Sequence, residues 1–351
     1  MRLDEPSWWY PPLGATAAKP VTWPAHILAP LAAAYGAITA RRMARAPAYK
    51  AARPVVCVGN LTVGGTGKTP LSITVAGLLA ELGAEAWFLT RGYGGSARGP
   101  HRVDPAVDTA ARVGDEPLLL AAHGAVVVAR DRATGAAFID ATAPANAVII
   151  MDDGLQNPAL AKNLTLCVVD QRRGIGNGRV FPAGPLRAPV AGQLAHVDAI
   201  IVMQSAGSGE PSVFDAAIRA GFPGPVLAAA TEPVLPAGGF GDAPHVAFAG
   251  IANPDRFFDL LAANGATIVE RRRFPDHHAL TGSEAAALLT LAESHGAALI
   301  TTAKDHARLR GTTGAVATLA ERSQVLPIAT VLDARDRERL ASLLRGAIAR
   351  K

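Results

Sequence analysis

The chain has 351 residues, which suggests about two domains. Its net charge of +5 lies in residues 1–53, which hold seven basic and two acidic side chains, whereas the remainder holds 27 of each. A charge-balanced body argues against a nucleic-acid binder. The two cysteines, Cys57 and Cys167, lie in apolar runs, which argues against a disulfide or a metal site and fits a reduced, cytosolic setting.

The N-terminal segment also holds three of the four Trp and three of the four Tyr residues. Its apolar stretch over residues 27–40 contains Pro30 and is too short to span a bilayer. One helical face would carry Leu28, Leu31, Tyr35 and Ile38, followed by Arg41, Arg42 and Arg45. We expect residues 1–50 to form a helical region lying on an anionic membrane surface, the alternative being an ordinary helix docked on the domain. The acidic, Pro-rich start does not fit a signal peptide.

A Gly-rich turn follows a predicted buried strand at residues 54–58 and precedes a predicted helix at residues 71–82. Strand, glycine turn, Gly-Lys-Thr and helix are the context of a phosphate-binding P-loop. The expected nucleotide-binding residues are Thr62, Val63, Gly64, Gly65, Thr66, Gly67, Lys68 and Thr69. Lys68 would reach the β- and γ-phosphates, and the Thr69 hydroxyl would bind Mg²⁺. Thr62 stands where the strict pattern has glycine, and the alternative is a glycine turn with a chance Lys-Thr.

Further strand-like runs predict a mostly parallel sheet with helical crossovers. They cover residues 84–90, 125–129, 147–151, 164–169 and 199–203. A stretch rich in Gly, Pro, Ser and Ala, residues 204–243, then predicts a linker region. Beyond it, strands are expected at 245–250, 266–274, 298–302 and 325–331, with helices at 254–264, 283–295 and 335–349.

The predicted fold is therefore α/β, a P-loop NTPase-type sheet with helices on both faces and a smaller C-terminal α/β domain. The expected parts are an interfacial region (1–50), a P-loop core (51–225), a linker (226–244) and the C-terminal domain (245–351).

Acidic and histidine residues mark candidate chemistry. Asp152 ends the apolar run at 147–151, where a Walker-B acid would hold Mg²⁺, although Asp-Gly also suits a turn. Asp115 and Glu116 open a predicted helix, as caps or as a general base. His277 and His278 could transfer protons, could bind metal or could be solvated, but no Cys or acidic cluster at metal-ligand spacing accompanies them.

Arginines in a Gly/Pro-dense loop, Arg179 and Arg187, could bind phosphates through their guanidinium groups, or could be surface side chains of an ordered connection.

Together these motifs resemble the tetraacyldisaccharide 4'-kinases, the lipid A 4'-kinases of Gram-negative bacteria. The resemblance covers nearly the whole chain, and the departure at Thr62 is a trait of that family. The motifs that carry it lie at residues 58–70, 91–94, 114–117, 152–156, 176–179, 182–187, 274–278 and 301–305.

The resemblance implies ATP- and Mg²⁺-dependent phosphorylation of the 4'-hydroxyl of a tetraacylated glucosamine disaccharide 1-phosphate. It also implies a peripheral enzyme on the cytoplasmic face of the inner membrane, with two domains that close around substrate. Lys68 and Thr69 would bind nucleotide phosphates and Mg²⁺, and Asp152 would serve the metal. Asp115 and His277 would form a catalytic base dyad that meets only on closure. Weaker implications concern nucleotide or lipid-phosphate contacts of Arg91, Tyr93 and Arg187.

Three residues depart from the family pattern, which commonly has His at Asn157 and Glu at Ala188 and Ala303. They argue against an imidazole or acid contributing at these positions. The alternative function is a P-loop GTPase or metallochaperone-like nucleotide switch. The sequence has neither the guanine-reading Asn-Lys-x-Asp nor the Cys/His metal ligands expected of such proteins.

Overall fold

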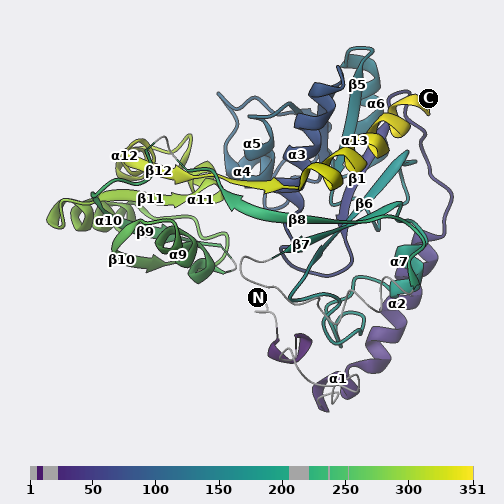
Figure 1. The fold of residues 1–351 in the computed structure, drawn as a ribbon, viewed down its shortest axis with the longest axis horizontal. Coiled ribbons are helices and arrows are strands. Elements are labelled where there is room, and N and C mark those ends of the chain that lie inside the picture. The colour runs from purple at the N-terminus through teal and green to yellow at the C-terminus, as the bar shows by residue number, and fades with distance from the viewer. Residues whose placement is uncertain (1–5, 11–22, 205–220, 236–237, 252, 351) are drawn as a thin grey trace. The chain divides into compact units, whose positions relative to one another are not determined.

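The structure, a computed structural model, describes residues 6–10, 23–204, 221–235, 238–251 and 253–350. Parts of the predicted N-terminal region and of the predicted linker therefore lie outside the described residues. The chain forms two compact units (Figure 1). Unit 1 comprises Met1–Thr90, Asp131–Thr231 and Thr330–Lys351, and unit 2 comprises Arg91–Arg130 and Glu232–Ala329.

Unit 1 contains a parallel sheet with six consecutive neighbouring strands. Their spatial order is β8 (Val226–Pro233), β7 (Ala199–Gln204), β6 (Leu164–Asp170), β1 (Val55–Asn60), β5 (Ala147–Asp152) and β2 (Glu85–Thr90). The central strands β1 and β5 are buried at every residue, as expected of apolar strands covered on both faces. The predicted α/β class is confirmed, but β8 occupies residues that were expected to be a linker.

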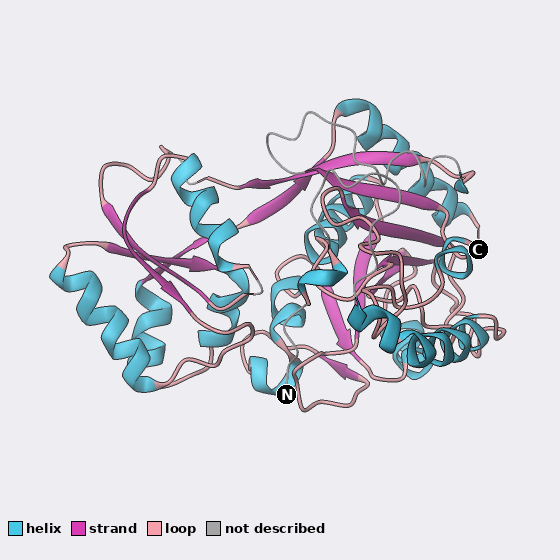
Figure 2. Ribbon diagram, turned by 90° about the horizontal axis from the view of Figure 1, so that it is seen from below, coloured by secondary structure: helices cyan, strands magenta, loops and turns pink. Residues whose placement is uncertain are grey.

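Helices accompany this sheet, and Figure 2 shows them in cyan beside the magenta strands. They are α1 (Trp23–Ile27), α2 (Ala29–Met43), α3 (Lys68–Glu81), α6 (Arg132–Thr142), α7 (Val190–Leu194) and α13 (Ala334–Ala349), preceded by the short 3-10 turn η1 (Ser7–Trp9). The α3 helix begins three residues earlier than predicted, because Gly67 adopts a left-handed conformation that turns the chain directly into the helix.

The last helix, α13, is bound into unit 1. The carboxylate of Asp336 accepts a hydrogen bond from the Ala228 amide (2.8 Å), and Asn163 donates to the Arg350 carbonyl (2.7 Å). The compact units thus group residues differently from the four predicted parts: the C-terminal helix joins unit 1, and residues 91–130 join unit 2.

Unit 2 contains a parallel sheet in the order β10 (Thr267–Arg273), β9 (Pro244–Ala249), β11 (Ala298–Thr302) and β12 (Ser323–Leu326). Its helices are α4 (Ala110–Val113), α5 (Asp115–Leu120), α9 (Pro254–Ala263), α10 (Gly282–Ser294), α11 (Ala303–Leu309) and α12 (Gly314–Arg322). Two short antiparallel strands flank α4 and α5 in the chain, β3 (His101–Arg102) before them and β4 (Ala125–Val128) after them.

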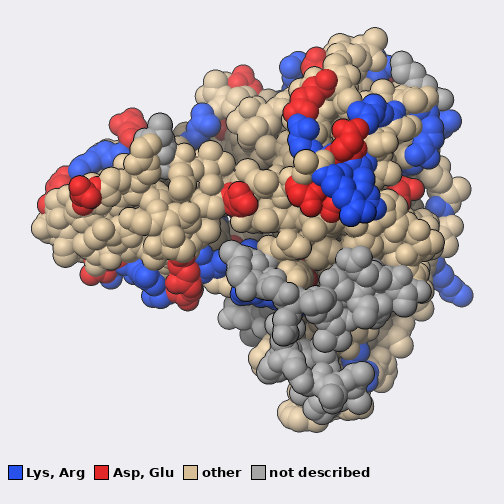
Figure 3. Space-filling model, in the orientation of Figure 1, with Lys and Arg blue, Asp and Glu red and all other residues tan. Residues whose placement is uncertain are grey.

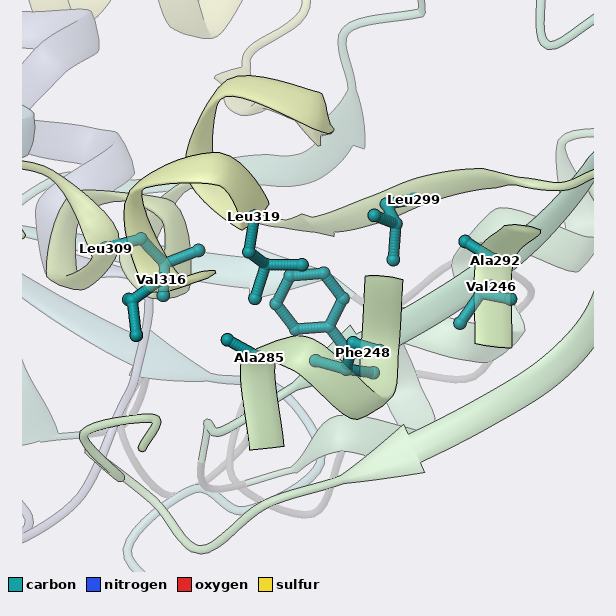
Figure 4. Close-up of a cluster of buried hydrophobic side chains, with 9 residues drawn as sticks. Val246, Phe248, Ala285, Ala292, Leu299, Leu309, Val316 and Leu319 are labelled. Carbon is teal, nitrogen blue, oxygen red and sulfur yellow. The ribbon is translucent and has the colours of Figure 1, made fainter. Parts of the chain in front are cut away.

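The apolar core on one side of the unit 2 sheet surrounds Phe248 of β9 (Figure 4). Leu319 of α12 and Ala285 of α10 pack against the same cluster, which binds these helices to the sheet. The single strand predicted at 325–331 is wrong: Pro327, which has no amide to donate, separates β12 from β13 (Ile328–Val331).

The α1–α2 segment buries three small residues and exposes five large apolar ones. Ala25, Ala32 and Gly36 are buried, and a Cβ on Gly36 would contact Val180 and Pro189. The exposed apolar row consists of Trp23 (75% exposed), Ile27 (66%), Leu31 (62%), Tyr35 (42%) and Ile38 (68%). Leu28, predicted on this face, instead packs beside Ala25 and Ala32. Within the described residues, no helix is long and apolar enough to cross a bilayer.

Charged side chains of both signs adjoin one another on the face shown in Figure 3. This mixture agrees with the balanced composition of the chain beyond residue 53.

Candidate functional site

The glycine-rich loop after β1 is held from two sides. The Asn60 side-chain amide donates to the Thr62 carbonyl (2.8 Å), and Arg187 Nε donates to the same oxygen (2.9 Å). The Val63 amide donates to the Pro185 carbonyl (2.8 Å). Thr62 does not have a positive φ, so a side chain at this position causes no backbone strain.

Two glycines shape the rest of the loop. Gly64 (φ 102°) and Gly67 (φ 89°) lie in the left-handed region that favours glycine, and Lys68 follows as the first residue of α3. Thr66 and Thr69 are buried, and the Thr66 hydroxyl has no hydrogen-bond partner among the described residues. The predicted residues 62–69 therefore form a loop at a helix N-terminus, the geometry that binds phosphate.

The acid facing the loop lysine is Asp153, which the sequence analysis missed. Its Oδ1 lies 3.7 Å from Lys68 Nζ and 2.6 Å from Arg187 Nη1. Burial raises the pKa of Asp153, but the charges of Lys68 and Arg187 outweigh it and hold that pKa at about 2. Asp152, the predicted metal residue, is the buried last residue of β5. The adjacent pair Asp152-Asp153 was the sequence feature from which a role for Asp153 could have been predicted.

Asp115 and His277 are paired within unit 2. Asp115 opens α5 with 4% of its side chain exposed, and its Oδ2 lies 3.0 Å from His277 Nδ1. Burial raises the pKa of Asp115, but the hydrogen bond and charge of His277, with the charges of Lys304 and Arg308, lower it below its usual value. The expectation that the two residues meet only on domain closure is wrong, since both belong to one compact unit.

The loop carrying His277 fixes its backbone. His277 has a positive φ of 57°, and its amide donates to the Gly250 carbonyl after β9 (3.0 Å). The ring is 25% exposed, so it is reachable from solvent. The neighbouring His278 faces a different partner: it stacks on Phe274 and bonds to Glu284 at 3.0 Å, which makes it part of the α10 capping region.

Close backbone packing joins the two glycine motifs of unit 2. A Cβ on Gly114 would lie 2.6 Å from the Tyr93 carbonyl, and one on Gly95 would lie 2.6 Å from the Val113 carbonyl carbon. Only glycine allows this approach. The loop at 91–95 and the start of α5 therefore position each other. Tyr93 is exposed, and its ring meets His277 edge-on, with centroids 6.0 Å apart; Arg91 is also exposed.

The other residues named in the sequence analysis make contacts with nearby groups. Glu116 pairs with Lys304 (2.7 Å), and the Arg179 amide donates to Asn177 Oδ1 (3.0 Å). Among the departures from the family pattern, Asn157 Oδ1 accepts from the Ala159 amide, the carbonyl of buried Ala188 accepts from Gln193, and Ala303 opens α11.

Comparisons with known proteins agree with one another. The model of the family described as tetraacyldisaccharide-1-P 4'-kinase matches residues 24–348. A protein named tetraacyldisaccharide 4'-kinase from Methylobacterium sp. strain 4-46 is 50% identical over 329 residues, covering 93% of this chain and 96% of that one. One of the same name from Nitrobacter hamburgensis is 44% identical, covering 99% of each.

The fold also matches a solved structure. A crystal structure of LpxK from Aquifex aeolicus in complex with ATP superimposes with a TM-score of 0.73 and 25% identity, covering 92% of this chain and 99% of that one.

Proposed function

The chain belongs to the tetraacyldisaccharide 4'-kinase family, and from that premise we propose that Asp115 and His277 form its catalytic pair. Its activity is ATP-dependent phosphorylation of the 4'-hydroxyl of tetraacyldisaccharide 1-phosphate in lipid A biosynthesis. The family match over residues 24–348 carries this conclusion. No comparison supports the nucleotide switch that the sequence left open as an alternative.

The loop at residues 62–69 is the proposed ATP site. Its amides and the N-terminus of α3 would hold the phosphates, and Lys68 would neutralise charge that develops during transfer. In the structure Lys68 faces Asp153, so nucleotide binding would replace this carboxylate by phosphate oxygens.

Oxygen ligands for Mg²⁺ lie around this loop. Thr69 and Asp152 would hold the ion, which supplies charge neutralisation at the transferring phosphate. In the described parts of the chain, no group of three or more His, Cys, Asp or Glu residues is arranged to hold a metal ion. Mg²⁺ at kinase sites commonly takes one or two carboxylates together with substrate phosphates, which is the arrangement proposed here.

The proposed proton acceptor is His277. His277 Nδ1 lies 3.0 Å from Asp115 Oδ2, so a proton on Nδ1 would leave Nε2, which lies 3.6 Å from Asp276 Oδ2, as the acceptor. The buried carboxylate orients the ring and stabilises the imidazolium formed when Nε2 takes the proton of the attacking 4'-hydroxyl. Arg91 and Tyr93 are proposed substrate contacts, supported by the exposure of both and by the Tyr93 ring beside His277, and Arg187 is a proposed phosphate contact.

A kinase assay with a tetraacyldisaccharide 1-phosphate acceptor tests the pair. Asp115→Asn and His277→Ala should each lower kcat by about 10²–10⁴-fold, the usual contribution of a general base. ATP binding should persist because the loop around Lys68 is untouched. His278→Ala is the matched control, since this neighbouring ring contacts Glu284 instead. Near-normal transfer by both pair variants would refute the assignment.

We further propose that the exposed row of α1–α2 rests on the cytoplasmic surface of the inner membrane. Large apolar side chains are expensive to leave in water, and Arg41, Arg42 and Arg45 follow them, all exposed and suited to anionic head groups.

A further inference from the structure

A mostly buried arginine lies beside the proposed catalytic pair. Arg308 of α11 has 9% of its side chain exposed, and its Nη1 lies 3.8 Å from Asp115 Oδ2. Its Nη2 donates to Asp305 Oδ1 (2.8 Å) and to the Gly250 carbonyl (3.0 Å). One guanidinium group thus lies next to two buried carboxylates and donates a hydrogen bond to one backbone carbonyl.

The peptide of Gly250 connects this arginine to His277. The Gly250 carbonyl accepts from both Arg308 and the His277 amide, and the Gly250 amide donates to Asp305 Oδ1 (3.0 Å). Asp305 is held in turn by the Thr302 hydroxyl (2.6 Å). This bracing matters because His277 adopts a positive φ, a conformation that costs energy for any residue with a side chain.

Electrostatics gives the same arginine a second role. The charged groups facing Asp115 are His277 from the loop after β10 and Lys304, Asp305 and Arg308 from α11, with Glu116 next to it on α5. Lys304 forms an ion pair with Glu116, and burial together with the negative charge of Asp115 raises the pKa of Asp305. Arg308 is the buried cation of this set, and a guanidinium keeps its charge at any working pH. Without it, Asp305 would lose the cation that lowers its pKa, and Asp115 would keep only Lys304 and His277.

We propose that Arg308 is a positioning residue for phosphoryl transfer, which places a positive charge beside Asp115 and fixes the backbone of His277 through Gly250. This inference rests on the proposed role of the Asp115–His277 pair. Arg308 itself need not touch the substrate.

The test is the pH dependence of kcat/KM in the full-length enzyme. Arg308→Met should move the acid limb of the profile up by about one pH unit, because removing a cation near the Asp115–His277 pair lets the pair as a whole take up a proton at higher pH. Transfer should therefore recover in part as the pH rises, which a purely structural defect would not do. Arg308→Lys keeps the charge and should leave the acid limb in place while lowering kcat, because its single ammonium cannot reproduce the two-armed contact.

Arg310, exposed and two residues away, supplies the matched control. Arg310→Met should leave both the profile and kcat unchanged. An Arg308→Met profile that superimposes on the wild type would overturn the proposal. If Arg308→Met fails to fold, Arg308→Gln and Arg308→Lys provide the test. Acid limbs at the same pH in these two variants would also overturn the proposal.

A double-mutant cycle separates this inference from the proposed function. If Arg308 acts through Asp115, part of the loss caused by Arg308→Met should disappear in an Asp115→Asn background, whereas the part that acts through Gly250 should remain. Additive losses would contradict the inference and leave the pair intact. Near-normal transfer by Asp115→Asn and His277→Ala would instead refute the pair itself.

Discussion

At the residue scale, the acid that faces Lys68 illustrates what a sequence leaves undecided. Neighbouring residues of a strand point to opposite faces, so the point where β5 ends determines which of Asp152 and Asp153 faces the loop. Asp153 has a positive φ of 50°, which places it in the turn beyond the strand. The apolar run predicted the strand and the acidic pair, but not this backbone conformation.

Asp153 should make stability depend on acid pH. Its folded pKa of about 2 lies below the unfolded value of about 3.9, so its ion pairs stabilise the fold above about pH 4, and this contribution is lost as the pH falls toward 2. The difference in unfolding free energy between wild type and Asp153→Asn should therefore shrink between pH 5 and the acid limit. Urea unfolding over that range measures it, and a difference independent of pH would contradict the assigned ion pairs.

At the scale of elements, the sequence predicted α2 correctly as an amphipathic helix but not how it is used. The prediction treated docking on the domain and contact with a membrane as alternatives. The helix docks through Ala32 and Gly36 while Leu31 and Ile38 remain exposed. Periodicity shows which residues share a helical face, but it cannot show that the face with Ala32 and Gly36 is the buried one. The same limit applies to residues 91–95 and α5: each motif was visible, but their close contact is a property of the fold.

Removing the exposed row should release the enzyme from membranes. Burying one large apolar side chain is worth about 1.5–3 kcal/mol, so Leu31→Gln with Ile38→Gln should weaken binding to anionic vesicles about 100-fold or more. Stability should be unchanged because both side chains are exposed. Vesicle co-sedimentation measures this, with Ala33→Gln, also exposed but small, as the control. Unaltered co-sedimentation of the double variant would leave docking as the helix's only role.

At the scale of the whole molecule, the compact units are interleaved along the chain. Nearly every predicted strand exists, because short apolar runs bounded by turn residues identify strands. Which unit a segment joins depends on pairing between distant strands, and this is why α13 and residues 91–130 could not be assigned from their order in the chain. The strand β8 and the short helices α11 and α12 were missed because Gly- and Ala-rich or short segments give little periodicity.

The C-terminal helix should therefore be needed for nucleotide binding. Leu340 and Leu344 of α13 are fully buried, so deleting residues 333–351 would expose the apolar surface beneath them and destabilise unit 1. ATP should then no longer raise the melting temperature, although every residue of the loop remains present. Deleting Lys351 alone is the control. Full thermal stabilisation of the truncated protein by ATP would show that α13 is dispensable for that unit.

The exposed row of α1–α2 bears on how such an enzyme finds its acceptor. A kinase resting on a bilayer through Leu31 and Ile38 searches in two dimensions, by lateral diffusion among lipids. Its rate would then follow the mole fraction of acceptor in the surface and not its concentration per volume. Adding inert lipid at constant total acceptor would slow the enzyme by surface dilution. A helix far in sequence from the proposed catalytic residues would thus determine that the rate depends on surface concentration.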